Sequence, residues 1–352
     1  MTFVITKVII IPLTSVFKIL SLAALKPTKS ADGLKFKKKS EEKMELNEKC
    51  LFLESLNKPG SLLVVESVIT TVINLTFSLI AAASNGIIII TFWRTKTLRS
   101  PPHLLLLCLS FADLITGIIV QPFYGAFKIT YLLKHYSLSC VFRVIMETVA
   151  WFSSALSCSL FTFIILERYL ALKFHLRYQE LITTKRVITF LVIHVVSIGG
   201  FSVSRFAMEN SKPFIAISVI GILTALAILL ICYCKIYQLV GRHHRQIRDQ
   251  HTTTVSAQTD PHLKSLKKSV LNMAFVASLY MIAYLPFTCV LITYLSCGFT
   301  RNVEAAYDIT RTVAFMASSW NPFLYCWKTA DLREAVVKFL RKSQGVTTVE
   351  EL

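Results

Sequence analysis

The sequence predicts an all-α membrane protein, a seven-transmembrane helix bundle followed by a short amphipathic helix. Composition is the first observation behind this fold class. The chain has 352 residues, of which 54% are hydrophobic and only 16% are charged, and its mean hydropathy is +0.59. A soluble domain carries about 25% charged residues. Multiple membrane spans are therefore the expected architecture.

Seven apolar runs are the second observation, since each reaches the length of about 20 residues that a transmembrane helix needs. They cover residues 63–93, 103–127, 144–166, 187–208, 214–240, 270–295 and 305–327. Lipid permits only helices or closed barrels to cross it, and the runs show no alternation of period two. Short connections make consecutive helices antiparallel neighbours.

The positive charges of the connections predict the orientation. The segments after the first, third, fifth and seventh spans are rich in Lys and Arg, whereas the segments on the other side are poorer in them. Lys and Arg accumulate on the cytoplasmic side of a membrane protein. We therefore expect a multi-pass protein of the plasma membrane with the N-terminus extracellular and the C-terminus cytoplasmic.

Three parts follow from this arrangement. Residues 1–62 are the expected extracellular N-terminus, residues 63–327 the seven-helix domain, and residues 328–352 the amphipathic helix with a cytoplasmic tail. The helix is expected over residues 329–340, lying on the inner membrane surface. Residues 1–43 are either a signal peptide, suggested by the apolar stretch 8–25, or an extension upstream of a start at Met44, which we favour. An eighth span there would contradict the charge pattern.

Short polar groups stand inside the apolar runs, and their cost in lipid calls for a functional explanation. In chain order these groups are Asn85, Asp113, Glu167-Arg168-Tyr169 and Asn321-Pro322-Phe323-Leu324-Tyr325. Together they resemble the rhodopsin-like (class A) family of G-protein-coupled receptors over about residues 64–340. The resemblance implies a receptor that activates heterotrimeric G proteins, with arrestin and receptor kinases as further partners.

The resemblance also implies roles at the cytoplasmic end. Arg168 would form the floor of the G-protein cavity, with Tyr233 and Tyr325 closing around it, and Leu176 would insert into the G protein. Pro286 matches the proline that kinks the sixth span. A plainer alternative for Arg168 is that it only extends to the membrane interface, as boundary arginines do. Glu167, Tyr169, Asn321 and Pro322 complete the expected activation set.

A carboxylate in mid-membrane must be protonated or must find a cation and hydrogen-bond donors. The resemblance places Asp113 at a sodium ion, with a polar network around it. The expected members of that network are Asn85, Asp113, Ser157, Ser318 and Asn321. A hydrogen-bonded packing core is the alternative, and the two are compatible. No other metal or cofactor is expected.

The ligand is constrained mainly by exclusion. Ala150 stands where amine receptors carry an Asp, and Phe315 stands where opsins carry the retinal-linking Lys, so both classes are disfavoured. The candidate pocket residues are Glu147, Trp151, Tyr284, Asp308 and Arg311. Arg143 and Glu147 share a helix face and are either an internal ion pair or a ligand-binding pair. A small molecule, a lipid and a peptide all remain open.

Cysteine positions narrow the resemblance. Residues 205–212 contain no cysteine, so the usual disulfide from the third span to that connection cannot form. This absence, a missing proline in the fifth span and the short connection resemble the melanocortin, cannabinoid, adenosine and lysolipid receptors, of which melanocortin receptors look nearest. They imply a Cys50–Cys297 bridge in an oxidising outer compartment. Cys140 is a third outer cysteine, so the pairing stays open.

Other classes fit less well. A transporter, the main alternative, would show inverted repeats or broken helices, and a channel would show a polar pore stripe or filter loop. No nucleophile–base or metal-ligand constellation suggests an enzyme. The net charge of +18 lies in short segments between apolar runs rather than in a basic helix, so no nucleic-acid partner is expected.

Overall fold

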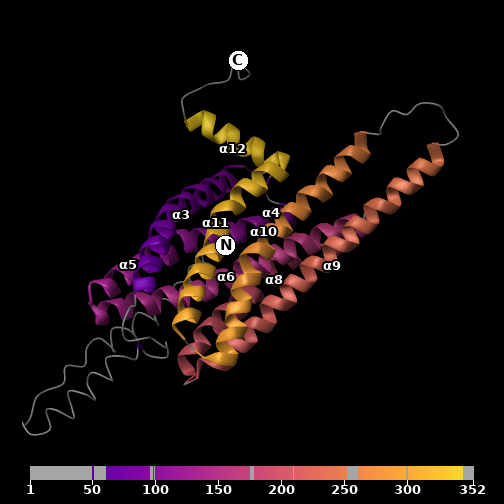
Figure 1. Ribbon diagram of the computed structural model, residues 1–352. Helices are drawn as coiled ribbons and strands as arrows, with labels where there is room; N and C mark the ends of the chain where they lie inside the picture. The colour runs from indigo at the N-terminus through magenta and orange to yellow at the C-terminus, as the bar shows by residue number, and fades with distance from the viewer. Residues whose placement is uncertain are drawn as a thin grey trace, which may run out of the picture.

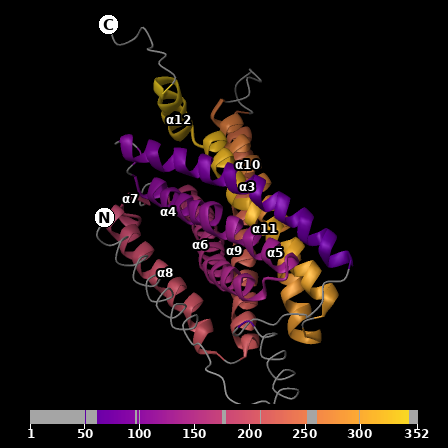
Figure 2. The ribbon, with the colours of Figure 1, turned by 90° about the vertical axis from the view of Figure 1, so that its left-hand side faces the viewer.

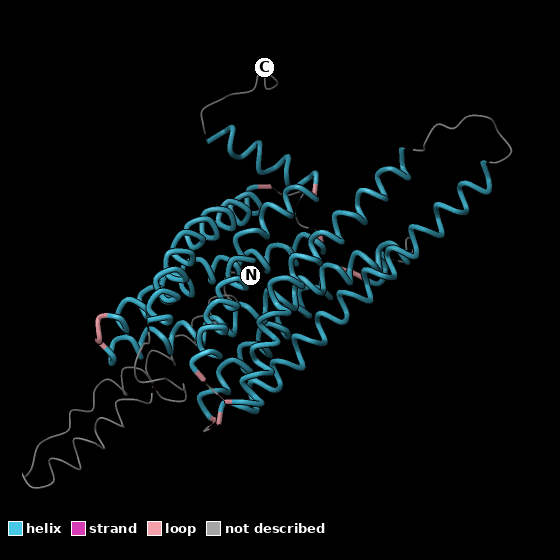
Figure 3. Tube along the Cα trace, in the orientation of Figure 1, coloured by secondary structure: helices cyan, strands magenta, loops and turns pink. Residues whose placement is uncertain are grey.

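The structure is a computed structural model that describes residues 50, 61–95, 98, 100–174, 178–208, 210–251, 261–298 and 300–343. This part of the chain is almost entirely helical (Figures 1 and 3). The helices are α3 (Ser61–Arg94), α4 (Pro101–Ile115), η2 (Thr116–Val120), α5 (Gln121–Leu132), α6 (Tyr136–Phe174), α7 (Tyr178–Leu181), α8 (Thr184–Ser204), η3 (Arg205–Ala207), α9 (Ser211–His251), α10 (Pro261–Cys297), α11 (Arg301–Lys328) and α12 (Ala330–Ser343).

The predicted bundle of seven spans is confirmed. One span is built from α4, η2 and α5 in sequence, and α3, α6, α8, α9, α10 and α11 supply the others. Six of the described spans are long and apolar enough to cross a bilayer on those grounds alone. The seventh, α11, carries Arg301, Glu304, Asp308 and Arg311 in its first half. The expected amphipathic helix is α12, which turns away from the bundle (Figure 1).

Several helices are longer than their apolar runs. Helix α6 begins at Tyr136 rather than at residue 144, α9 ends at His251 rather than at residue 240, and α10 begins at Pro261 rather than at residue 270. Hydropathy marks only the part of a helix that lies in lipid, whereas its backbone hydrogen bonds continue equally well in water. Figure 1 shows α9 and α10 projecting beyond the other helices at the end where α12 lies.

Helix α6 occupies the centre of the bundle, packing against α4, α5, α8 and α9, while α3 packs against α11, α4 and α5. Helix α8 lies at the periphery (Figure 2), and its main partners are α6 and α4. The principal core joins Leu109 of α4, Leu160 and Phe161 of α6 and Tyr280 of α10, all at most 1% exposed.

The second span contains a π-helical turn, η2. At Gly117 a β-carbon would come within 2.9 Å of the Ala81 side chain and of the Ala82 backbone nitrogen on α3, so only glycine fits this helix crossing. The Gly117 carbonyl accepts a hydrogen bond from the Ser78 hydroxyl at 2.7 Å. The π-turn therefore brings the second span into direct backbone contact with the first.

The predicted Cys50–Cys297 bridge is wrong. Cys50 bonds to Cys140, four residues into α6, with a Cα–Cα distance of 5.4 Å, which is ordinary disulfide geometry. Cys297 ends α10 and is a free, exposed cysteine. The prediction followed the receptor group that the sequence resembled, and the third outer cysteine proved to be the competing partner.

Candidate functional site

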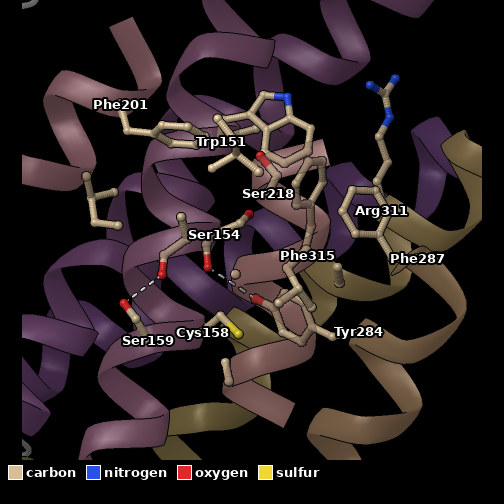
Figure 4. Close-up of a pocket in the computed structure, with 18 of the residues that line it drawn as sticks. Trp151, Ser154, Cys158, Ser159, Phe201, Ser218, Tyr284, Phe287, Arg311 and Phe315 are labelled. Carbon is tan, nitrogen blue, oxygen red and sulfur yellow. Dashed lines mark hydrogen bonds between the residues drawn. The ribbon is translucent and has the colours of Figure 1, made fainter. Parts of the chain in front are cut away.

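A cavity of about 300 Å³ lies among α6, α8, α9, α10 and α11. Figure 4 shows Trp151 and Arg311 at one end of it and Cys158 at the other. Its walls are predominantly apolar, and a few polar groups gather at its ends, which is the usual character of a small-molecule site. Of the predicted pocket residues, Glu147, Trp151, Tyr284 and Arg311 line this cavity.

The end of the cavity at Arg311 is closed by ion pairs, which we call the roof. Glu147 accepts a bond from Arg311 at 2.6 Å, from Arg205 at 3.5 Å and from the Tyr307 hydroxyl at 3.3 Å. Glu147 and Arg311 are 3% exposed and Arg205 is 7% exposed. The Arg205 guanidinium also lies 5.9 Å from the centroid of the Trp151 ring. The predicted carboxylate is thus held by two cations from α11 and η3.

The roof continues into a second group of buried charges. Arg311 pairs with Asp308, three residues before it on α11, at 2.5 Å. Asp308 in turn bonds to Lys128 of α5, which reaches Glu66 of α3 at 3.5 Å. Three carboxylates therefore face three cations. Isolated charges are very costly away from water, so this balance explains how α11 lies inside the bundle despite its polar first half.

Asp113 is the centre of the predicted polar network. Its two oxygens accept hydrogen bonds from the Ser157 hydroxyl at 3.0 Å and the Asn321 amide at 2.7 Å. The same amide of Asn321 donates to the Tyr280 hydroxyl at 3.1 Å. Asn85 donates to the backbone carbonyl of Ser318 at 3.0 Å. The expected residues from four spans therefore meet.

The donor set fits a sodium ion. The side-chain carbonyl oxygens of Asn85 and Asn321 are buried and accept no hydrogen bond within the described residues. Hard cations prefer oxygen ligands, and a carboxylate beside two unsatisfied carbonyl oxygens supplies them. The Ser157 hydroxyl is a further oxygen at the same point.

The opposite end of α6 carries the Glu167-Arg168-Tyr169 group. Arg168 pairs with Glu167 at 3.3 Å, and Glu167 also accepts a hydrogen bond from the Tyr178 hydroxyl of α7. Burial, together with this bond, raises the pKa of Tyr178, so the hydroxyl remains a donor at physiological pH. Glu167 is 5% exposed. The buried carboxylate thus holds both Arg168 and the segment after α6.

Comparison with known proteins agrees with this geometry. The family model described as "7 transmembrane receptor (rhodopsin family)" matches residues 84–214 and 207–325. The chain belongs to this family. The predicted class A membership is therefore confirmed, and the protein is a multi-pass G-protein-coupled receptor rather than an enzyme.

Individual relatives are distant. G-protein coupled receptor 12 of Homo sapiens is 26% identical over 274 residues, covering 72% of this chain and 76% of that protein. Histamine H2 receptor of Cavia porcellus is 24% identical over 292 residues, covering 77% and 79%. Alpha-1A adrenergic receptor of Homo sapiens is 23% identical over 308 residues, covering 75% and 66%. The resemblance to the melanocortin, cannabinoid, adenosine and lysolipid receptors is loosely consistent with the match to G-protein coupled receptor 12.

The receptor leaves some predicted contacts at the G-protein end unmade. Tyr233 is half-buried on α9, and the Tyr325 hydroxyl is buried without a hydrogen-bond partner in the part of the chain that the structure describes. Arg168 is held by Glu167 instead. Pro286 and Pro322 lie inside α10 and α11, as expected. Leu176 lies outside the described residues.

Sequence reasoning missed three residues of the buried charge network. Glu66 lies within the first apolar run, where a lone acid in lipid is itself a signal of function. Lys128 and Arg205 lie at the ends of their apolar runs, where a basic residue is ordinarily taken as part of a connection. Tyr280 was not among the residues expected in the Asp113 network, and its hydroxyl proves to join that network.

Proposed function

We propose that this receptor binds an extracellular ligand in the cavity and activates a heterotrimeric G protein at the end that carries Arg168. The plasma membrane is its expected location, with the N-terminus outside, because the basic connections favour that orientation. Arrestin, receptor kinases and surrounding lipids are the further partners implied by its family. The chain is formally +18, and basic cytoplasmic connections suit an anionic inner leaflet.

A continuous series of contacts from the cavity to the seventh span carries the proposal. Tyr284 lines the cavity and stacks on Tyr280, with ring centroids 5.5 Å apart. The Tyr280 hydroxyl bonds to Asn321, which bonds to Asp113. A ligand that moves Tyr284 would therefore disturb the hydrogen bonds that hold α11 to α4. Such coupling requires only that the ligand bind the two arrangements with different affinity.

A sodium ion at Asp113 belongs to the same proposal. It would satisfy the unpaired oxygens of Asn85 and Asn321, and it would favour the arrangement in which the spans converge on the carboxylate. The ion supplies positive charge there, while Ser157 and the Asn321 amide orient the carboxylate.

Arg168→Ala tests the signalling role. We expect nucleotide exchange on the G protein to fall to the receptor-free rate, because the cation at the G-protein end is lost, while surface expression stays largely intact. The measurement is nucleotide exchange with purified receptor in lipid nanodiscs, at matched receptor amounts. Lys173→Ala removes a cation five residues further along α6 and should retain exchange. Exchange at the unmodified rate by Arg168→Ala would refute the assignment.

A further inference from the structure

We propose that the cavity takes its ligand sideways from the bilayer, through an opening between α8 and α9, and that this ligand is a single-chain lipid with an uncharged hydrogen-bonding head. The inference rests on the proposed function for the identity of the cavity as the ligand site. Four features of the site lead to it: a closed roof, an open side, apolar walls and a balanced set of charges.

The roof blocks access along the bundle axis. Glu147 and Arg311 line the end of the cavity, Arg205 pairs with Glu147 there, and all three are nearly inaccessible to solvent. Beside them, Phe201 of α8 stacks on Phe214 of α9 with centroids 4.6 Å apart, and the Arg205 guanidinium lies 5.3 Å from the Phe214 ring centroid. A water-soluble ligand would have to break these ion pairs and separate the stacked rings to enter.

The side of the cavity is open instead. Ile217 and Gly221 of α9 line the cavity and are also exposed on the surface of the bundle, Ile217 by 52%. On the facing helix, Ile198 lines the same cavity and is half-buried. Helix α8 packs mainly on α6 and α4, whereas α9 packs mainly on α6 and α10. The two helices therefore flank an opening over α6.

The opening lies at the depth of the acyl chains. It is bounded at one end by the Phe201–Phe214 stack, and the cavity behind it extends to Ser159 of α6, which bonds to His194 of α8 at 2.7 Å. His194 to Phe201 is seven residues of helix, or about 10 Å. Helix α8 continues for less than two turns beyond Phe201 into η3, so the opening falls inside a hydrocarbon layer about 30 Å thick.

The neighbouring surface is apolar as well. Ile193 and Val196 of α8 and Ile220 and Leu223 of α9 are exposed hydrophobic residues on the two helices that frame the opening. A molecule that passes between them comes from lipid rather than from water. Its body must be apolar, because the walls beyond the opening are predominantly apolar.

The polar end of the cavity defines the head group. The Trp151 indole N–H and the Arg311 Nε–H are buried and donate no hydrogen bond within the described residues, so the head should carry acceptor oxygens. The charges of the roof and of its extension through Asp308, Lys128 and Glu66 are paired three to three, and the nearby Arg143 and Glu304 add one charge of each sign. An ionised head would add an uncompensated buried charge, which is costly. A monoacylglycerol has the required chemistry.

Photolabelling tests entry independently of signalling. The probe is a long-chain monoacylglycerol with a diazirine in its acyl chain, placed in nanodiscs that hold the full-length receptor. In Gly221→Leu a side chain should obstruct the opening, and labelling of cavity residues should slow about tenfold, within the range over which association rates vary between variants of one site. Gly200→Leu is the matched control. Both glycines are exposed, and a β-carbon at either meets nothing within 4 Å.

A second variant should change the labelling rate in the opposite direction, and misfolding could not explain a faster rate. Ile217→Ala should widen the opening and speed labelling severalfold. Equal labelling rates for Gly221→Leu and Gly200→Leu would overturn the side entrance, as would slower labelling of Ile217→Ala. Trp151→Phe should weaken retention of the lipid about fivefold, the effect of one hydrogen bond.

The head-group assignment has its own comparison. Lysophosphatidic acid and a short-chain, water-soluble glycerol ester are tested in parallel as competitors of the photolabelling monoacylglycerol for the cavity. Stronger competition by the anionic lipid would overturn the uncharged head, and equal competition by the soluble ester would overturn entry from the bilayer. Nucleotide exchange is measured on the same preparations. A receptor that drives exchange but takes up no lipid would refute this inference alone, while lipid uptake without exchange would refute the proposed signalling function.

Discussion

At the scale of single residues, one hydroxyl distinguishes the centre of this receptor. Tyr280 stands where its family usually has Phe, and its ring stacks on Phe161 with centroids 3.7 Å apart. A phenylalanine would make the same stack. The added hydroxyl accepts a hydrogen bond from the Asn321 amide at 3.1 Å and therefore connects α10 to the Asp113 network. In this same arrangement Arg168 is paired with Glu167, so the hydroxyl belongs to the resting arrangement.

Tyr280→Phe should raise ligand-independent nucleotide exchange about fivefold, because a buried hydrogen bond contributes about 1 kcal/mol to the arrangement that contains it. The measurement is basal exchange against receptor amount. Tyr237→Phe removes a hydroxyl from an exposed tyrosine of α9 and should change nothing. An unaltered basal rate in Tyr280→Phe would mean that the hydroxyl does not stabilise the resting arrangement.

Asp113→Asn should abolish the effect of sodium on basal exchange, since the substitution keeps the size of the side chain and removes its charge. A sodium titration at constant ionic strength, with potassium as the replacement, measures this directly. Cys108→Ala, on the same helix, should retain the sodium dependence. Superimposable titration curves for Asp113→Asn and the unmodified receptor would count against a sodium site.

At the scale of elements, α11 is the helix whose position depends most on its partners. Four charged residues lie in its first half, and it lies in the bundle because Asp308 and Arg311 are paired with residues of α5 and α6. Its long contact with α3 includes the hydrogen bond from Asn74 to Thr312 at 3.0 Å. Charge pairing therefore takes the place of apolar surface in this span.

Arg311→Met should lower the free energy of unfolding by about 3–5 kcal/mol, because it leaves Glu147 and Asp308 with one buried cation fewer. Thermal unfolding of purified receptor in detergent provides the measurement. Arg301→Met changes an exposed arginine at the start of the same helix and should leave the midpoint unchanged. Equal midpoints for the two variants would show that the buried pairs do not stabilise α11.

At the scale of the whole molecule, the balance between resting and active arrangements depends on how firmly the G-protein end is closed. In many members of the family, the arginine at the position of Arg168 pairs with an acidic residue that lies twenty positions before the proline corresponding to Pro286. That position is Leu266 here, and its side chain lies outside the part that the structure describes. The described partner of Arg168 is Glu167, on its own helix, so this pair cannot hold α10 against α6.

Measurable ligand-independent signalling is therefore expected, and Leu266→Glu should reduce it. An exposed ion pair contributes about 0–1 kcal/mol and more when partly desolvated, and about 1.4 kcal/mol would change the ratio of the two arrangements tenfold. Basal second-messenger output against surface density measures the effect. Leu266→Gln is the uncharged control. A flat response in the unmodified receptor would contradict this account.

Local patterns in the sequence were sufficient for the seven spans and the amphipathic helix, whereas the members of the Asp113 network other than Tyr280 were expected from the family resemblance. Hydropathy and charge act on each segment separately, and lipid admits few alternatives to a helix. The cost of a polar group in lipid marks Asn85, Asp113 and Asn321 as functional, but only the resemblance to the receptor family implied that they meet each other and Ser157.

Only the tertiary structure decided which distant residues pair. Lys128 and Asp308 are 180 positions apart, and nothing local to either indicates the other. Cys50 had two candidate partners in the sequence, and packing brought Cys140 to it. The opening between α8 and α9 likewise depends on how both helices lie on α6. Helix formation is local, whereas charge pairing, disulfide choice and cavity shape depend on how helices pack, because each needs side chains from several helices at one point.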